Sequence, residues 1–255
     1  MDNNFLNNSN ILGMRVDATN YNKATNQVIQ WAKNNDSSYV CIANVHMTME
    51  AYNNPKFKKL VNGADMVTPD GMPLVWTLRR LGMKIDDRVY GPTLMLHICE
   101  AAEKHGIPIG LYGGSSETIE ALKKNLKNKY AKIKIVYSYS PPFRSLTSEE
   151  DEQIITDINT SGVKILFVGL GCPKQEYWMN SHQKRFNLVM LGVGAAFDFH
   201  AGKIKQAPNW MQRTGLEWLF RLIMEPKRLW KRYLKHNPRF VVLITLQLFK
   251  IWKKK

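Results

Sequence analysis

The sequence predicts an α/β fold, with a Rossmann-like, mostly parallel sheet, helices on both faces, and a basic helical appendage at the C-terminus. Two observations support this prediction. Short apolar, β-branched runs alternate with longer stretches of helical pattern, and the positive charge gathers at the end of the chain. At 255 residues the chain is long enough for one sizeable α/β domain with an appendage.

Each element is expected where its pattern is clearest. Runs rich in Val, Ile, Leu, Tyr and Phe predict strands at Tyr39–Ala43, Ile109–Tyr112, Ile133–Tyr137, Ile165–Val168 and Leu188–Val193, and another strand-like run ends before Asp70. Helical spacing predicts helices at Asn22–Lys33, Met47–Val61, Thr93–Lys104, Glu117–Lys129, Ser148–Asn159 and Gln175–Lys184. In such a sheet, ligands bind in the loops after the strands.

The net charge of +15 predicts an anionic partner, which is a nucleic acid, a phosphate-bearing substrate or an acidic lipid surface. From Arg221 to Lys255 there are eleven Lys and Arg residues and a single acid, Glu225. Most of the charge therefore belongs to the tail. We place the boundary between His200 and Ala207, so that residues 1–204 form the α/β domain and residues 205–255 the appendage.

The tail also carries apolar residues at helical spacing, namely Leu216, Leu219, Phe220 and Ile223. Arg221, Arg228 and Arg232 are spaced by seven and four residues and are expected on one helix face. A basic helix with aromatic and aliphatic neighbours is typical of a membrane-surface element. A solvated helix packed on the core is the alternative. Nucleic-acid binding is disfavoured because the tail has no recognised nucleic-acid module.

The compartment is inferred from the cysteines and the termini. Cys41, Cys99 and Cys172 form no CxxC pair, which excludes a zinc ribbon and indicates reduced thiols. The start of the chain has no apolar signal-peptide core, and no stretch approaches the roughly 20 apolar residues of a spanning helix. We expect a cytoplasmic protein, peripheral at the inner face of the cell membrane.

Two of the expected loops could carry catalysis. Asn44 and His46 follow the first strand. Asn44 is either a helix N-cap or a site residue. His46 is either a catalytic residue or simply a capping or surface residue. Asp70 lies between Pro69 and Gly71, which restrict the turn. A carboxylate held in this way suits a general base, although an Asx turn is an equal alternative.

Three further loops are candidates for binding a nucleotide diphosphate. Gly113, Gly114 and Ser115 lie between a strand and a helix. Glycines and a helix N-terminus in this position suit the binding of a phosphate. The alternative is that the three residues form only a tight turn. The next loop contains Gly169, Gly171, Lys174, Gln175 and Glu176, of which Lys174 could neutralise phosphate and Gln175 and Glu176 could bind a base or ribose. The last contains Asp198 among small residues, which could instead serve close packing.

The same loops limit the cofactors. Without a DxD-type pair or a His, Asp and Glu cluster at metal-ligand spacing, we expect a reaction with no metal and no other cofactor, in which helix N-termini and basic side chains meet the diphosphate charge. A nucleotide-dependent oxidoreductase is an alternative, disfavoured because GxGxxG is missing.

Four segments together resemble the WecG/TagA/CpsF family of bacterial glycosyltransferases, glycosyltransferase family 26. They are Pro69–Gly71 (PDG), Gly171–Glu176 (GCPKQE), Gly192–Lys203 (GVGAAFDFHAGK) and Gly215–Arg228 (GLEWLFRLIMEPKR). The resemblance extends from Gly13 to about Arg239. It implies a compact α/β catalytic domain that transfers a sugar from UDP to a polyprenyl-diphosphate-linked saccharide. In the best-known branches of the family the sugar is N-acetylmannosamine. The resemblance also implies a role in the synthesis of a cell-surface polymer such as teichoic acid, capsule or exopolysaccharide.

The resemblance also implies roles for single residues. The family's proposed catalytic aspartate matches Asp70, its asparagine matches Asn44, and the Gln of its PKQE segment matches Gln175. Its C-terminal appendage, whose arginines are thought to engage the membrane and complete the active site, matches Leu216–Arg232. We expect inversion at the sugar, with His46 orienting it or meeting diphosphate charge, and we also consider a homo-oligomer formed through apolar surface near the appendage.

This chain departs from one family pattern. Relatives with a Thr-Pro-Asn segment after the first strand have a threonine implicated in catalysis, whereas this chain has Ile42-Ala43-Asn44. His46 stands where those relatives carry an acid. The departure places the protein in a different branch and leaves the donor sugar open.

Overall fold

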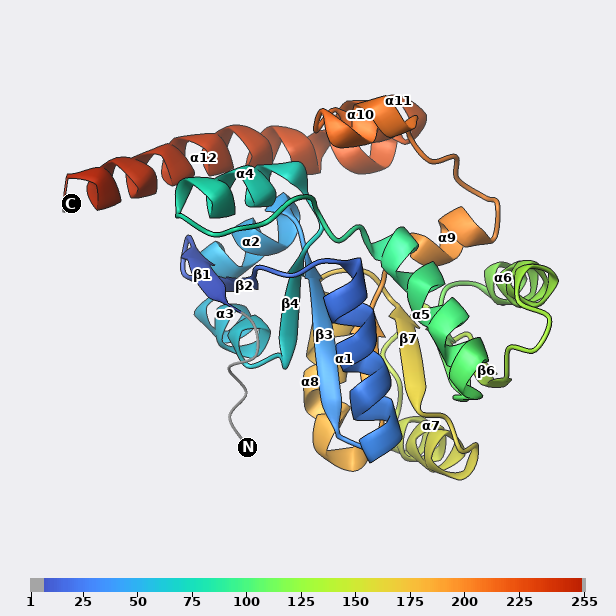
Figure 1. Ribbon diagram of the computed structural model, residues 1–255. Coiled ribbons are helices and arrows are strands. Elements are labelled where there is room, and N and C mark those ends of the chain that lie inside the picture. The colour runs from blue at the N-terminus through green and yellow to red at the C-terminus, as the bar shows by residue number, and fades with distance from the viewer. Residues whose placement is uncertain (1–6, 254–255) are drawn as a thin grey trace.

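The computed structural model describes residues 7–253. The first six residues, on which the expectation about a signal peptide partly rests, and the last two lysines of the basic tail lie outside this range. Figure 1 shows a central sheet between layers of helices, with a long C-terminal helix along one end of the molecule.

The predicted parallel sheet is confirmed. Its six strands follow the order β4-β3-β8-β7-β5-β6, and every neighbouring pair is parallel. The strands are β3 (Ser38–Ala43), β4 (Met66–Pro69), β5 (Ile109–Gly113), β6 (Ile135–Tyr139), β7 (Ile165–Gly169) and β8 (Val189–Gly192). Because all six run in one direction, the loops singled out in the sequence emerge at one edge of the sheet.

Both faces of the sheet are covered. Alternate residues of β3 face opposite sides, with Tyr39 and Cys41 in one apolar cluster and Val40 and Ile42 in the other. The first cluster contains side chains of α2 (Val45–Asn53), α3 (Pro55–Asn62), α7 (Ser148–Thr160) and α8 (Lys174–His182). The second contains side chains of α1 (Tyr21–Asn34), α5 (Gly91–His105), α6 (Ser116–Lys129) and α9 (Ala196–His200). A short 3-10 helix, η1 (Gln183–Arg185), follows α8.

One predicted helix is wrong. The pattern at Met47–Val61 suggested a single helix, but α2 ends and α3 begins around Asn54. The side chain of Asn54 accepts hydrogen bonds from the backbone N–H groups of Lys56 and Phe57, at 3.0 and 3.2 Å, and Pro55 occupies the first position of α3. Proline is tolerated at the start of a helix but not in its interior, so the chain turns here.

A hairpin near the start of the chain and a helix after Asp70 are among the elements that were not predicted. The strands β1 (Asn8–Ile11) and β2 (Met14–Asp17) form an antiparallel hairpin, which is short and largely polar at its first strand. Helix α4 (Met72–Arg80) follows the turn after Asp70, and five of its nine residues are buried.

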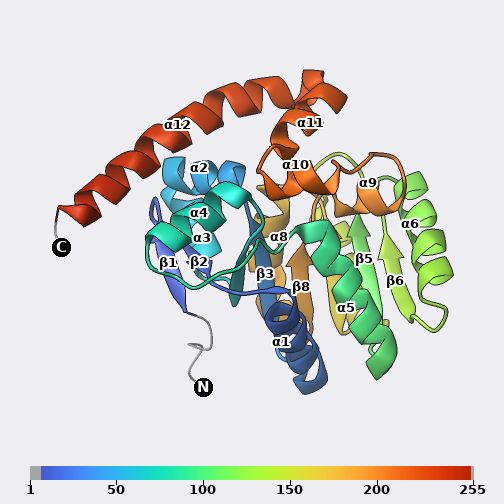
Figure 2. The same ribbon diagram turned by 45° about the horizontal axis from the view of Figure 1, so that its top comes forward.

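The appendage consists of α10 (Asn209–Arg213), α11 (Glu217–Met224) and α12 (Pro226–Trp252). Pro226 starts α12, so Arg221 lies on α11 whereas Arg228 and Arg232 lie on α12, and the prediction of one helix face for all three is wrong. Figure 2 shows α12 running across the molecule above α2. Phe240 and Ile244 of α12 are buried in the core cluster that contains α2.

The far part of α12 is held by the hairpin. The Gln247 side chain accepts a hydrogen bond from the Leu12 amide at 2.8 Å and donates one to the Asn10 carbonyl at 2.7 Å. Other residues of α11 and α12 are apolar and exposed, among them Ile223, Leu234, Val241, Val242, Leu246, Phe249 and Trp252. Over the described range, the chain contains no helix with both the length and the apolar character needed to cross a membrane.

Candidate active site

The structure divides the five candidate loops between two cavities at the same edge of the sheet. A cavity of about 850 Å³ lies between the ends of β3 and β4 and the appendage, and we call it the appendage cavity. A second cavity of about 740 Å³ lies over the ends of β5 and β7, and we call it the loop cavity. The two loops predicted to carry catalysis line the first cavity, and the loops predicted to bind the nucleotide lie at the second.

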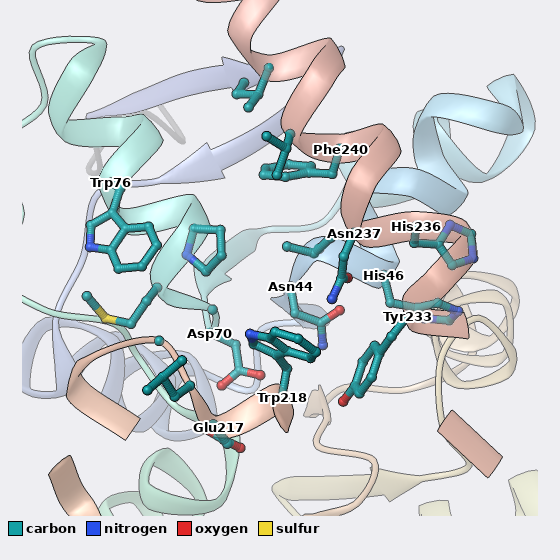
Figure 3. Close-up of a pocket in the computed structure, with 18 of the residues that line it drawn as sticks. Asn44, His46, Asp70, Trp76, Glu217, Trp218, Tyr233, His236, Asn237 and Phe240 are labelled. Carbon is teal, nitrogen blue, oxygen red and sulfur yellow. The ribbon is translucent and has the colours of Figure 1, made fainter. Parts of the chain in front are cut away.

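The appendage cavity contains the three predicted catalytic residues. Asn44, His46 and Asp70 enter it from the core, while Trp218, Tyr233 and Phe240 enter from α11 and α12. Figure 3 shows Asp70 and Asn44 beside the Trp218 ring. The lining is mostly apolar, with a few polar groups that converge near Asp70, as is usual for small-molecule sites.

Asp70 follows β4 directly and is held by backbone groups. Its amide donates to the Ala43 carbonyl at 2.7 Å, and its Oδ1 accepts a hydrogen bond from the Gly91 amide at 3.1 Å. The Asx-turn alternative does not describe this carboxylate, because its hydrogen bond joins it to Gly91, which is 21 positions away. Burial raises the pKa of Asp70 to about 6, against the opposing effect of the Arg88 guanidinium. Such a pKa suits a general base near neutral pH.

Arg88 is a site residue that was not predicted from the sequence. Its Nη1 donates to Glu217 Oε2 at 2.5 Å and to the Asp70 carbonyl at 3.4 Å, while its Nη2 donates to Gln212 Oε1 at 2.8 Å. Arg88 thus joins the turn at Asp70 to two helices of the appendage. Arg88 and Glu217 are 129 residues apart, so no local pattern could have paired them.

Asn44 combines the two roles considered for it. Its side-chain oxygen accepts from the Met47 amide at 3.1 Å and so caps α2, and the residue also lines the appendage cavity.

His46 is half-buried beneath α12. Burial, together with the nearby cation Arg232, lowers the pKa of His46 to about 3. A neutral imidazole can orient a sugar, but it carries no charge to meet a diphosphate.

The loop cavity is lined by most of the predicted donor residues. Gly114, Ser115, Gly169, Lys174 and Asp198 all line it. Ser115 caps α6, accepting from the Thr118 amide at 3.3 Å, so the N-terminus of a 14-residue helix lies at the cavity. Such a terminus favours an anion.

Lys203 belongs to the same cavity and was not among the predicted donor residues. Its Nζ donates to Ser115 Oγ at 3.2 Å. Lys203 is the last residue of the Gly192–Lys203 segment, which was the available signal. The side chain of Asp198 accepts a hydrogen bond from the Thr118 hydroxyl at 3.5 Å.

Two of the candidate glycines are required by packing. Gly113 has φ +119°, and a Cβ there would lie 2.6 Å from the Gly169 carbonyl carbon. A Cβ on Gly169 would lie 2.6 Å from the Phe197 ring. The ends of β5 and β7 therefore approach each other more closely than residues with side chains allow. Gly171, with φ +78°, has open space around it.

Gln175 and Glu176 are buried and line neither cavity. Gln175 Nε2 donates to Glu176 Oε1 at 2.7 Å, and Gln175 Oε1 accepts from the Gly171 amide at 3.1 Å. Burial raises the pKa of Glu176 to about 7. Gln175, supported by Glu176, therefore holds the Gly171 loop in place through a buried hydrogen bond.

The three predicted arginines differ in position. Arg221 and Arg232 line the appendage cavity, whereas Arg228 points away and pairs with Glu225 at 2.6 Å. Glu225 also lies 3.7 Å from Arg221. The single acid of the tail thus links α11 to α12.

The expectation that no metal-spaced cluster exists is wrong for the folded chain. Ligand atoms of His46, Glu50 and His236 lie within 4.8 Å of one another. His46 and Glu50 are four residues apart on α2, which was a visible signal, but His236 comes from α12. The third residue required the fold.

The chain is similar to a known family of enzymes. The model of the Glycosyl transferase WecG/TagA/CpsF family matches residues 9–254. An N-acetylglucosaminyldiphosphoundecaprenol N-acetyl-beta-D-mannosaminyltransferase of Bacillus spizizenii is 28% identical over 211 residues, which cover 82% of this chain and 79% of that protein. A protein of the same name from Staphylococcus aureus (strain MW2) is 28% identical over 248 residues, covering 96% of this chain and 95% of the relative.

The family match spans nearly the whole described chain, and it includes the Asp70 turn, the strand-end loops and the appendage. The chain therefore belongs to the WecG/TagA/CpsF family and is a glycosyltransferase.

Proposed function

We propose that this enzyme transfers an N-acetylhexosamine of the N-acetylmannosamine type, or a related hexose, from a UDP-sugar to a polyprenyl-diphosphate-linked saccharide. The observation that carries the proposal is Asp70, a carboxylate with a raised pKa at the base of a largely apolar cavity roofed by the appendage. The two relatives are named as N-acetylmannosaminyltransferases that act on a sugar carried by diphosphoundecaprenol, and these names support the choice of sugar and of lipid diphosphate. Such transfers build cell-surface polymers.

The donor is assigned to the loop cavity. Its α6 N-terminus, Lys174 and Lys203 offer backbone N–H groups and positive charge to a diphosphate. Tyr112 and Trp178, whose rings stack at 4.4 Å, line the same cavity and offer an aromatic surface to a base. These groups support a donor diphosphate whose charge is met by protein groups, in a transfer step that uses no metal ion.

The transfer is an inverting displacement. Asp70 accepts the proton of an acceptor hydroxyl, the hydroxyl oxygen bonds to the anomeric carbon, and the bond from that carbon to the UDP oxygen breaks. The pair of electrons leaves with UDP, and the proton remains on Asp70. The neutral His46 and the amide of Asn44 lie in the same cavity and can hydrogen-bond sugar hydroxyls.

The acceptor is assigned to the appendage cavity. Arg221 and Arg232 line it and can pair with a lipid diphosphate, and the apolar lining suits a polyprenyl chain. The exposed apolar residues of α11 and α12, set among lysines and arginines, support docking on an anionic membrane surface. On this proposal the enzyme acts as a peripheral protein at the cytoplasmic face of the cell membrane.

A panel of UDP-sugars tests the proposal. UDP release is measured with and without a polyprenyl-diphosphate-GlcNAc analogue, and UDP-N-acetylmannosamine is expected to give the largest acceptor-dependent rate. No acceptor-dependent release from any UDP-sugar would contradict the proposal. NAD(P) binding would then favour the oxidoreductase alternative, and salt-sensitive binding to DNA or RNA the nucleic-acid alternative.

A further inference from the structure

Three side chains that commonly bind transition metals meet where α12 crosses α2. Glu50 Oε1 lies 3.8 Å from His46 Nε2 and 3.5 Å from His236 Nε2. The two imidazole rings are 5.3 Å apart between centroids and nearly perpendicular. In Figure 3, His46 and His236 lie together at one side of the appendage cavity. Each histidine lines that cavity.

Hydrogen bonding within the described chain does not account for this cluster. The contacts to Glu50 are longer than the ~2.7–3.2 Å of a good N–H···O bond. His236 is only 4% exposed and His46 is half-buried, so the two Nε2 atoms face Glu50 with little access to water and without a good hydrogen bond to it. A shared ion would satisfy all three groups.

We propose that His46, Glu50 and His236 bind one Zn²⁺ ion, which ties α12 to α2 beside the appendage cavity. Two imidazoles and one carboxylate form a His₂Glu set, a combination known for zinc with a fourth position left open. A hard cation such as Mg²⁺ prefers oxygen ligands, of which this cluster offers only one residue.

Zinc binding draws the three side chains together. Zinc bonds of about 2.0–2.1 Å in a tetrahedron separate neighbouring ligand atoms by about 3.3 Å. The contacts of Glu50 Oε1 with the two imidazoles, at 3.8 and 3.5 Å, exceed this spacing, and all three ligand atoms lie within 4.8 Å of one another. Glu50 is about one-third exposed, so its side chain has room to adjust. A water molecule can complete the four-coordinate set.

The ion has a structural consequence for the appendage. The helix α12 is held at its far part by Gln247 on the hairpin and in its middle by Phe240 and Ile244 in the core. A zinc bond to His236 adds a third attachment, close to Tyr233 and Asn237, which also line the cavity. The ion therefore fixes the part of α12 that roofs the site.

The test is metal binding, and it needs neither sugar nor lipid. Untagged full-length protein, treated with a chelator and dialysed, is titrated with Zn²⁺ and separately with Co²⁺, whose visible spectrum reports a four-coordinate site. We expect one ion per chain and a rise in the thermal midpoint with Zn²⁺. His236→Gln and Glu50→Gln should each weaken binding by more than about 100-fold, beyond the roughly 10- to 100-fold effect of losing an outer-shell partner.

His105→Gln is the matched control, because His105 is exposed at the end of α5, away from the cluster. It should bind Zn²⁺ as the unmodified chain does. Circular dichroism checks that both cluster variants are folded. Glutamine has nearly the same size and shape as glutamate, so Glu50→Gln still tests the site if His236→Gln disturbs α12. The proposal would be overturned if the unmodified chain bound no Zn²⁺, or if both cluster variants bound Zn²⁺ as tightly as the unmodified chain. Either result leaves the transferase proposal intact.

Discussion

The guanidinium of Arg88 donates a 2.5 Å hydrogen bond to the carboxylate of Glu217, and both side chains are about nine-tenths buried. Arg88 lies in the loop between α4 and α5, whereas Glu217 opens α11 of the appendage. The same arginine nitrogen reaches the Asp70 carbonyl at 3.4 Å. The docked position of the appendage is therefore coupled to the electrostatics of the proposed base.

Glu217→Gln should lower stability and shift the pH profile. The variant keeps a hydrogen-bond acceptor but removes the charge that pairs with the buried Arg88 guanidinium, which costs about 1.5–3 kcal/mol of unfolding free energy. The Glu217 charge raises the pKa of Asp70, so its removal should move the acid limb of activity to lower pH. Denaturant unfolding and a pH–rate profile check both effects.

Arg88→Met is the complementary variant. The Arg88 guanidinium holds the pKa of Asp70 down, so its loss should move the acid limb to higher pH. If the two substitutions shifted the limb in the same direction, the electrostatic link between the pair and Asp70 would be wrong.

The unmodified enzyme should lose activity as the pH falls through about 6. Burial raises the folded-state pKa of Asp70 to about 6, and only the deprotonated carboxylate can accept the acceptor proton. The rate kcat/KM should therefore be nearly level at pH 7–8 and fall about tenfold per unit below about pH 5. A flat profile down to pH 4, measured while circular dichroism shows folded protein, would remove Asp70 as the titrating base.

Lys203→Met should weaken donor binding. Lys203 Nζ lies at the Ser115 cap of α6, and loss of one charge-assisted contact of about 1.5–3 kcal/mol raises KM for the UDP-sugar by about 10- to 100-fold. Lys164→Met is the control, because Lys164 precedes β7 at the opposite end of the sheet. Equal KM values for the two variants would argue against the loop cavity as the donor site.

Gly113→Ala should be more destabilising than Gly162→Ala. Both glycines have positive φ, at +119° and +75°, but only the Cβ at residue 113 meets backbone, 2.6 Å from the Gly169 carbonyl carbon. Strain alone costs roughly 1–2 kcal/mol in the left-handed region, and overpacking adds about 1–3 kcal/mol. Thermal or denaturant unfolding measures the difference, and equal losses would show that the ends of β5 and β7 can separate freely.

Much of the fold could be predicted because it rests on local patterns. The parallel strands were recognisable from buried apolar runs such as Ile165–Val168, and α7 from the helical spacing of Ser148–Asn159. The break at Asn54 was missed because Asn54 caps two helices at once, and apolar spacing continues across it. The hairpin of β1 and β2 was missed because its first strand is short and polar.

The site was less predictable because it depends on distant residues. Asp70 and Asn44 could be singled out from their own loops, but Arg88 acquires its place through Glu217 and Gln212 of the appendage. Likewise, His46 and Glu50 are neighbours on α2, whereas His236 reaches them only because α12 folds back. The division into two cavities also depends on the position of α11 and α12, which no strand-end loop encodes.

The most direct test of the central claim compares Asp70→Asn with the unmodified enzyme. Transfer from UDP-N-acetylmannosamine to a polyprenyl-diphosphate-GlcNAc analogue is measured under single-turnover conditions, with binding of both substrates determined separately. Loss of a general base predicts a rate lower by about 10²- to 10⁴-fold with substrate binding nearly unchanged. A rate within a few-fold of the unmodified enzyme would contradict the claim that Asp70 deprotonates the acceptor.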